Sequence, residues 1–258
     1  MLLNIIFIIA GIAIVLWGAD RLTEGAVAVA ERMKIPQIVI GLTIVAMGTS
    51  MPEFCVSLIS ALKGTPDLAV GNVVGSNIFN TLLIVGLSGA IAPMVILRST
   101  VLKDIPFALV ASVILMMMCF DGKIGRIDAA VLFVFFLIFM YMTVTGAKIE
   151  KKDLEAENKL AETALEIVPK MSTTMSAIWI IVGLGCLIGG STLFVEGATQ
   201  LATSLGVSEA IVGLTVVAGG TSLPELATSV VSARKGNSGI AIGNVLGSNV
   251  FNVLAILG

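Results

Sequence analysis

The chain has 258 residues, of which 57% are hydrophobic and 12% are charged, with a net charge of −2 and no histidine. The charged share is roughly half that of a typical soluble domain, so the composition excludes an ordinary globular protein and points to a chain that lies in lipid. The basic residues are scattered between apolar stretches, which argues against nucleic-acid binding. Without histidine the chain lacks the commonest transition-metal ligand and general base.

Long apolar runs recur along the chain, and about 20 such residues cross a bilayer as a helix. Only helices and closed barrels satisfy the backbone in lipid, and these runs are too long and too evenly apolar for barrel strands. The sequence therefore predicts an all-α integral membrane protein. The eight predicted spans lie near residues 3–20, 37–60, 68–92, 104–120, 127–147, 175–200, 208–232 and 240–258.

The positions of lysine and arginine predict the orientation, because cytoplasmic connections carry an excess of both. With the N-terminus outside, twelve of these residues lie in inside connections and three, Lys63, Lys123 and Arg126, lie outside. We therefore expect the N-terminus outside. The polar stretch that follows the fifth span carries both signs of charge and is expected to be a partly helical cytoplasmic connector.

The chain matches itself when it is shifted by 172 residues. GLTIVAMGTSMPE at 41–53 aligns with GLTVVAGGTSLPE at 213–225, and 25 of the 42 positions in 41–82 are identical to their partners in 213–254. Five predicted spans separate the copies, so the second copy enters the membrane from the opposite side. The predicted organisation is an inverted-topology repeat. It comprises a first repeat of five spans at 1–147, a cytoplasmic linker at 148–174, and a second repeat of three spans at 175–258.

The motif GTSMPE places polar residues in the middle of the second span. Pro52 lacks an N–H, so the helix is expected to kink there and to release a carbonyl one turn earlier. Thr49 and Glu53 share one face, with Ser50 beside them and the Ala46 carbonyl one turn before. Free carbonyls and a carboxylate are costly at membrane depth unless a cation occupies them.

The neighbouring span and the second copy extend this set. Ser76 and Asn80 share a helix face, and Gly71 and Gly75 would allow close helix packing. All the ligands are oxygen atoms, which hard cations such as Ca²⁺ and Na⁺ prefer. The candidate metal-binding residues are Ala46, Thr49, Ser50, Glu53, Ser76, Asn80, Ala218, Thr221, Ser222, Glu225, Ser248 and Asn252.

Glu53 and Glu225 are the only acids well inside the predicted spans, and no basic residue lies at their depth. Moving their two negative charges through a low dielectric is prohibitive. One Ca²⁺ or two Na⁺ would neutralise them, which predicts obligate exchange of the two ions. A kink with a silent, protonated glutamate is the alternative, which the matched second copy disfavours. Asp20, Glu24 and Glu196, at the ends of spans, are interpreted as interfacial anchors.

At these motifs the chain resembles the sodium/calcium exchanger family, within the calcium/cation antiporters. Its paired GTSxPE and GNxxGSNxFN segments are similar to the alpha repeats of that family, and the resemblance covers nearly the whole length. It implies four adjacent cation sites lined by the candidate residues, with extracellular Na⁺ driving Ca²⁺ out. It also implies two long helices, matching the first and sixth spans, that slide across the ion-binding core. Glycines suited to such sliding are Gly11, Gly18, Gly183, Gly185, Gly189 and Gly190.

Two features depart from the family pattern. The family usually has ten spans and this chain offers eight, so we expect the second repeat to be truncated. Asn252 stands where some relatives have aspartate, and asparagine in both copies is similar to the K⁺-independent members. The proton-coupled branch has a different motif around its acid.

We therefore predict a Na⁺/Ca²⁺ antiporter that works by alternating access in the plasma or inner membrane, as a monomer. It is not expected to be an enzyme or to need a cofactor, since Na⁺ and Ca²⁺ are its substrates and the lipid bilayer is its surroundings. Exchange of Ca²⁺ for H⁺ or for another cation is the alternative within transport; H⁺ is considered because a desolvated glutamate can bind a proton. A cation channel and an intramembrane protease with paired acids are the alternatives from other classes.

Overall fold

The computed structural model describes residues 1–160, 171–208 and 212–258, and its regular elements in these ranges are helices. The first repeat begins with α1 (Leu2–Met33), α2 (Gln37–Ile40), η1 (Gly41–Val45), α3 (Ala46–Thr49), α4 (Met51–Leu62), α5 (Pro66–Phe79), η2 (Asn80–Ile84) and α6 (Val85–Ile91). It continues with η3 (Thr100–Asp104), α7 (Ile105–Met118), η4 (Cys119–Asp121) and α8 (Arg126–Leu160). The second repeat holds α9 (Thr173–Ser204), η5 (Gly213–Val217), α11 (Ala218–Thr221), α12 (Leu223–Arg234), α13 (Ser238–Phe251) and η6 (Asn252–Ile256).

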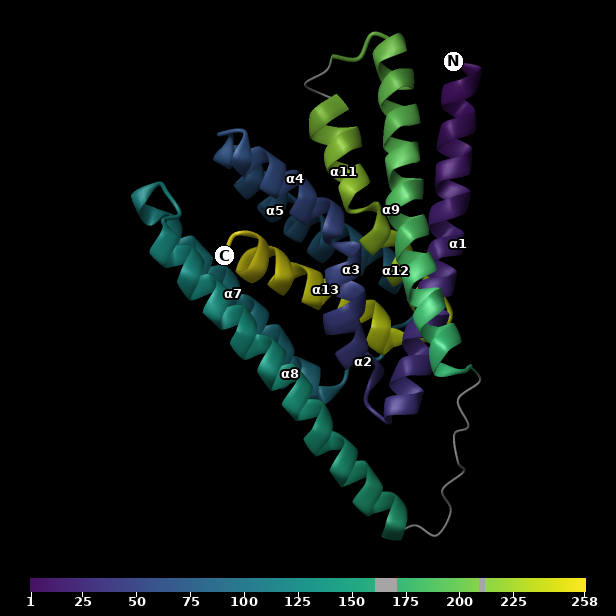
Figure 1. Ribbon diagram of the computed structural model, residues 1–258, viewed down its shortest axis with the longest axis vertical. Coiled ribbons are helices and arrows are strands. Elements are labelled where there is room, and N and C mark those ends of the chain that lie inside the picture. The colour runs from purple at the N-terminus through teal and green to yellow at the C-terminus, as the bar shows by residue number, and fades with distance from the viewer. Residues whose placement is uncertain (161–170, 209–211) are drawn as a thin grey trace.

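The 172-residue repeat reappears in the bounds of these elements. Adding 172 to the bounds of α4 and α5 gives those of α12 and α13, and the π-helical turns η1 and η2 map onto η5 and η6 in the same way. The equivalent helices α1 and α9 run in opposite directions (Figure 1). The predicted inverted-topology repeat is therefore confirmed. Single π-helical turns often mark functional sites, and here they flank the repeated motifs.

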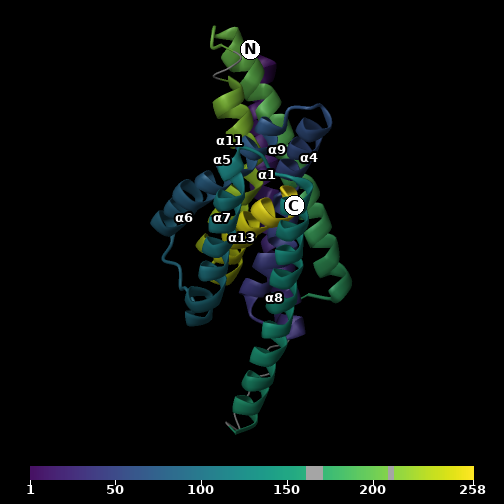
Figure 2. The same ribbon diagram turned by 90° about the vertical axis from the view of Figure 1, so that its left-hand side faces the viewer.

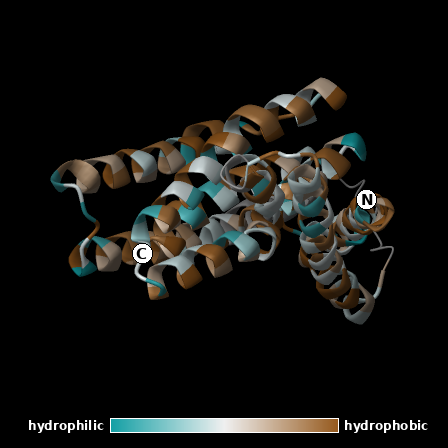
Figure 3. Ribbon diagram, turned by 90° about the horizontal axis from the view of Figure 1, so that it is seen from above, coloured by the Kyte–Doolittle hydropathy of each residue, from teal (hydrophilic) through white to brown (hydrophobic). Residues whose placement is uncertain are grey.

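Six helical stretches of the described chain are long and apolar enough to cross a membrane: Leu2–Met33, Pro66–Ile91, Thr100–Asp121, Arg126–Ala147, Thr173–Ser204 and Ser238–Ile256. A bent pair, Gln37–Thr49 with Met51–Leu62, adds a seventh if it is one span. The remaining predicted span, 208–232, includes residues 209–211, which lie outside the described residues, so the number eight stays a prediction. Hydrophobic ribbon dominates the peripheral helices (Figure 3), in keeping with the predicted membrane fold.

Two predicted bounds were too short. The first helix continues to Met33, beyond the expected 3–20, and ends where Lys34 adopts a left-handed backbone (φ 53°) two residues before Pro36. The helix of the fifth predicted span, α8, continues to Leu160, so part of the predicted linker, 148–174, is helical. Residues 161–170 of that linker lie outside the described residues.

The long helices α1 and α9 pack together as a two-helix arm through glycines spaced seven residues apart. A Cβ on Gly18 would lie 2.9 Å from the Gly183 carbonyl oxygen, and one on Gly11 would lie 2.7 Å from that of Gly190. Only glycine allows backbones to approach so closely. Four of the six glycines predicted to suit sliding over the core thus join α1 to α9 instead. For Gly185 and Gly189 no described atom lies within 4 Å of a Cβ, so that interpretation is wrong for them.

The core contributes the small residues where the arm meets it. Gly48 lies against Leu184 of α9, and Gly220 lies against Val195. On the opposite side α7 and α8 cover α13 and η6, with α7 and α8 in front of α13 in Figure 2. Leu132, Phe136 and Phe251 are buried in this contact. The repeated motifs therefore lie between the arm and the α7–α8 pair.

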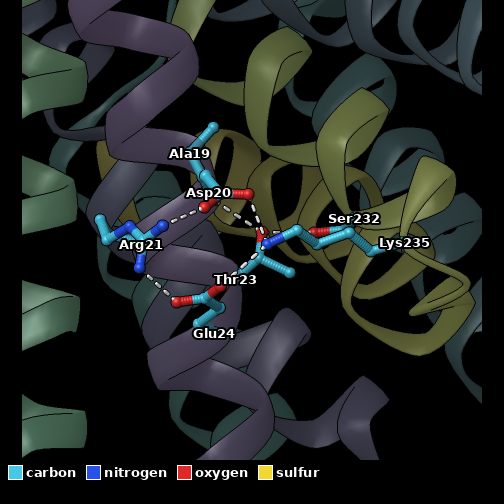
Figure 4. A network of polar contacts seen from close by, with 7 residues as sticks. All are labelled: Ala19, Asp20, Arg21, Thr23, Glu24, Ser232 and Lys235. Atoms are coloured by element: carbon cyan, nitrogen blue, oxygen red, sulfur yellow. Dashed lines mark hydrogen bonds and ion pairs between the residues drawn. The ribbon is translucent and has the colours of Figure 1, made fainter.

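A polar network ties the arm to the end of α12 (Figure 4). Lys235 forms ion pairs with Asp20 and, at 3.2 Å, with Glu24, while Arg21 bonds the same two carboxylates from α1 itself. One turn away the buried hydroxyls of Thr23 and Ser232 lie 2.9 Å apart. Two of the acids interpreted as interfacial anchors thus hold α1 against the core.

Candidate cation-binding site

Each repeat breaks its helix at the serine of the GTSxPE motif. Ser50 (φ −82°, ψ 8°) separates α3 from α4, and Ser222 (φ −87°, ψ 7°) separates α11 from α12. The prolines stand in the first turn of α4 and α12, where a missing N–H is tolerated, and the first pair of helices is bent by 47°. The predicted kink is therefore present, and it starts a new helix within the membrane.

The two glutamates lie in these first turns and meet across the pseudo-two-fold axis. Glu53 and Glu225 are fully buried. The Ser50 hydroxyl donates to Glu225 Oε1 at 2.8 Å, and the Ser222 hydroxyl donates to Glu53 Oε1 at 2.9 Å. Each serine thus bonds the carboxylate of the other repeat. The positive ends of two helix dipoles also point at the pair, which favours negative charge there.

The neighbouring helices α5 and α13 complete the cluster. Ser76 donates to Glu53 Oε1 at 3.3 Å and lies 3.1 Å from the Ser222 hydroxyl. Ser248 reaches the Ala46 carbonyl at 3.5 Å. Asn80 and Asn252 are fully buried at the junctions with the π-helical turns. Residues predicted from both repeats are therefore brought together in one place.

Four buried oxygens of this cluster have no hydrogen-bond donor among the described residues: Glu53 Oε2, Glu225 Oε2, Asn80 Oδ1 and Asn252 Oδ1. They form two repeat-related pairs, and all can only accept. Buried acceptors are normally satisfied, and a hard cation would satisfy four such oxygens together. The described residues contain no cluster of three or more His, Cys, Asp or Glu, so hydroxyl and amide oxygens would have to join the carboxylates.

The two halves of the cluster are not equally enclosed. Thr49 is buried and donates to Asn244 Oδ1 at 3.0 Å, whereas Thr221 is half-exposed and donates only to the Ala218 carbonyl among its described partners. Ala46 is buried and Ala218 is exposed. The Ala46 carbonyl also accepts the backbone N–H of Ser50 at 3.0 Å. Of the predicted residues in the first copy, Ala46 therefore offers the least free oxygen.

The glycines next to the site are also more closely packed in one repeat than in the other. A Cβ on Gly243 would lie 2.7 Å from the Ile38 carbonyl oxygen, and one on Gly247 would lie 2.6 Å from that of Leu42. Around their equivalents, Gly71 and Gly75, no described atom lies within 4 Å. The prediction that Gly71 and Gly75 allow close packing is wrong here, because α13 packs against η1 and α3 more closely than α5 packs against α11.

A cavity of about 600 Å³ lies between α9 and the α4 and α11 segments. Its lining includes Thr221 of the cluster and Glu196 of α9. The chain enters α1 at the same end of the molecule at which α9 finishes (Figure 1), and Glu196 lies in the last third of α9. The cavity thus lies toward the end predicted to be outside.

Sequence reasoning missed several polar residues around the cluster. Asn72 donates to the Glu53 carbonyl at 3.1 Å and to Ser57 at 2.9 Å, and Asn244 repeats both contacts at Glu225 and Ser229. Asn72 lies four residues before Ser76, so the same spacing that selected Ser76 and Asn80 could have found it. Asn77 and Asn249, the second asparagines of the repeated motif, were also missed.

The chain was compared with known proteins. The family model for sodium/calcium exchanger proteins matches residues 3–145 and 175–258. The chain is 38% identical to the putative antiporter CaxA of Alkalimonas amylolytica, over 100% of this chain and 80% of CaxA. It is 27% identical to the sodium/calcium exchanger MaX1 of Methanosarcina acetivorans, over 99% of this chain and 81% of MaX1.

A structure of the sodium-calcium exchanger NCX_Mj soaked with Na⁺ and Ca²⁺ matches with a TM-score of 0.85 and 30% identity, over 100% of this chain and 81% of that one. The match agrees with the all-helical membrane fold and with the resemblance in the repeated motifs. The chain is thus a multi-pass membrane protein that belongs to the sodium/calcium exchanger family.

Proposed function

We propose that the protein exchanges Na⁺ for Ca²⁺ across the plasma or inner membrane, with the ions bound between the two inverted repeats at the bilayer midplane. The observation that carries this proposal is the pair of buried carboxylates bridged by Ser50 and Ser222, together with four acceptor oxygens that lack donors. The proposed ligands are the twelve residues selected from the sequence. The ions are substrates, and the protein needs no cofactor and acts as a monomer.

Charge supplies the reason for exchange. With both glutamates ionised, the empty site carries two negative charges, and no basic side chain bonds either carboxylate among the described contacts. One Ca²⁺ or two Na⁺ would neutralise the pair, whereas the empty site would have to cross a low-dielectric region uncompensated. Loaded forms change sides readily and the empty form does not, so movement of one ion requires return of the other.

The unequal enclosure of the two halves supports alternating access. Gly243 and Gly247 of α13 pack closely against backbone atoms of α2 and η1, whereas no described atom lies within 4 Å of a Cβ on their α5 equivalents. The cavity borders α11 of the second repeat. Because the repeats are equivalent, exchanging their two packing arrangements would close one face and open the other. The names of MaX1 and NCX_Mj support Na⁺ as the coupling ion. Ca²⁺/H⁺ exchange is the second candidate, because the two carboxylates can also bind protons.

Uptake of ⁴⁵Ca²⁺ into proteoliposomes tests the proposal. Vesicles loaded with Na⁺ should accumulate Ca²⁺ when external Na⁺ is low, and uptake should stop when Na⁺ is equal on both sides. Glu53→Gln and Glu225→Gln each remove one of the paired charges and should reduce uptake at least tenfold. Asp67→Asn is the matched control, because Asp67 is an exposed acid in the first turn of α5 and should leave uptake unchanged.

Two results would contradict Na⁺/Ca²⁺ exchange. Uptake driven by a pH gradient without Na⁺ would favour the Ca²⁺/H⁺ candidate. Uptake that needs no counter-ion on the opposite side would remove obligate exchange and favour a channel.

A further inference from the structure

The side chains of Asn77, Asn80, Asn249 and Asn252, which we call the amide girdle, cross-link the two repeats beside the carboxylates. Asn80 Nδ2 donates to Asn249 Oδ1 at 3.1 Å, and Asn252 Nδ2 donates to Asn77 Oδ1 at 3.0 Å. These are repeat-related contacts, and each joins the third asparagine of one GNxxGSNxFN motif to the second asparagine of the other. Asn80 Oδ1 and Asn252 Oδ1 are left buried and without donors.

An asparagine amide presents either an oxygen or an NH₂ group, depending on a half-turn about its last bond. Asn252 also donates to Ser76 at 3.2 Å, and Ser76 donates to Glu53, so one hydroxyl separates this amide from a carboxylate. An amide that is not held could turn over and place its NH₂ where its oxygen now lies. That orientation would repel a cation from the site.

In the structure the NH₂ group of Asn252 is held by both Ser76 and Asn77, and two relays of hydrogen bonds leave the oxygens of Asn80 and Asn252 without donors. In the first relay the backbone carbonyl of Asn77, which can only accept, takes the Thr81 hydroxyl at 2.8 Å. Thr81 must then accept, and Asn249 Nδ2 donates to it at 3.0 Å. The oxygen of Asn249 is thereby left to receive the NH₂ of Asn80, and the oxygen of Asn80 has to face away from Asn249.

The second relay is one step shorter. The backbone carbonyl of Asn249 accepts Asn77 Nδ2 at 3.1 Å, so Asn77 Oδ1 receives the NH₂ of Asn252. The position equivalent to Thr81 in the second repeat is Val253, which cannot take part. In both relays the direction of every bond is determined by a backbone oxygen that has no choice but to accept.

We propose that Asn77 and Asn249 are positioning residues: they hold Asn252 and Asn80 so that each presents its oxygen to the transported cation. This inference rests on the proposed function, because it assumes that the cation lies beside Glu53 and Glu225. The two residues act through their partners and need not touch the ion.

Replacing Asn252 or Asn80 with aspartate provides the test. Both oxygens of a carboxylate accept hydrogen bonds, so turning the group over changes nothing. In the otherwise unchanged protein, Asn77→Leu should raise the Kd for Ca²⁺ at least tenfold. In the Asn252→Asp background, the same Asn77→Leu change should alter the Kd less than twofold. Equilibrium ⁴⁵Ca²⁺ binding to the purified protein measures both effects.

Equal fold-changes in the two backgrounds would mean that Asn77 only packs, and the positioning role would be overturned. If Asn77→Leu fails to fold, Thr81→Val carries the test, because valine already occupies the equivalent position in the second repeat. Thr81→Val should raise the Kd several-fold in the unchanged protein and not in the Asn80→Asp background, and equal changes in both would overturn the inference. If the unchanged protein bound no Ca²⁺, the proposed function itself would fail.

Discussion

The serines at the helix breaks are the residues through which the repeats contact each other's carboxylates. Each serine donates to one oxygen of the opposite glutamate, and in the proposed site its own oxygen would face the ion. A hydrogen bond to a charged group contributes about 1.5–3 kcal/mol. Ser50 and Ser222 therefore orient the two carboxylates.

Because the two serines are equivalent, their removal should have equivalent effects. Ser50→Ala and Ser222→Ala are each expected to raise the Kd for Ca²⁺ about tenfold, measured by equilibrium ⁴⁵Ca²⁺ binding, since each removes a proposed ligand oxygen and a hydrogen bond to a carboxylate. Ser112→Ala is the control, because Ser112 bonds only its own helix on the exposed side of α7. A tenfold effect from one serine and none from the other would show that the carboxylates do not act as a pair.

The pairing of α1 with α9 belongs to the scale of whole elements. Glycines at seven-residue spacing place the two backbones in contact at several points along their length, and Trp17 packs edge-on against Trp179. Such an interface tolerates no added side chains. We therefore expect the arm to move as one body in the proposed exchange, with any sliding where Leu184 and Val195 meet the glycines of the core.

A methyl group added inside the arm should destabilise the protein. A Cβ on Gly183 would lie 2.7 Å from the backbone nitrogen of Leu22, and overpacking of this kind costs about 1–3 kcal/mol. Gly183→Ala should thus lower the thermal unfolding temperature in detergent. Gly189→Ala, on the same helix with no described atom within 4 Å of the new Cβ, should leave it unchanged or raise it slightly. The reverse order of the two variants would contradict the arm as described.

At the scale of the whole molecule, the two faces of the core differ in the ion pairs that join the arm to them. The network of Lys235, Asp20 and Glu24 joins α1 to α12 at the end predicted to be cytoplasmic. The equivalent residues at the other end are Lys63 and Glu196. Lys63 has no ion pair among the described residues, and Glu196 lines the cavity. The same two side chains of each repeat are thus paired at one face and apart at the other.

Breaking the ion pairs of Lys235 with Asp20 and Glu24 should expose the cytoplasmic side of the core. With Cys55, Cys119 and Cys186 replaced, Ser232→Cys reports access, since Ser232 is buried one turn from Lys235. Adding Lys235→Gln should speed labelling of this cysteine several-fold by an impermeant maleimide applied from the cytoplasmic side. The ion pairs of Lys235 are partly exposed, so Lys235→Gln should change the free energy of unfolding little. Lys63→Gln is the matched control, and an equal acceleration by it would contradict a role for the Lys235 pairs in closing this face.

The membrane fold could be predicted from the sequence because lipid requires long apolar helices. The inverted repeat could be predicted because the two copies share identical residues at a constant offset. The same reasoning selected Glu53, Ser50 and their second-copy partners, since each motif carries its polar residues at one-turn spacing. It could not show which atoms face each other across the repeats. The contacts of Ser50 with Glu225 and of Asn77 with Asn252 join positions more than 170 residues apart in the chain.

The amino-acid sequence by itself determined the helices, their breaks next to the prolines and the oxygen-only character of the candidate site. Only the tertiary structure decided that the glycines of α1 and α9 face each other and that the two half-sites are unequally enclosed. The physical reason is that spacing along a helix defines its faces, whereas identical motifs can pack in two different ways. Which way each copy packs depends on the neighbouring helices, and nothing in the motif itself records that choice.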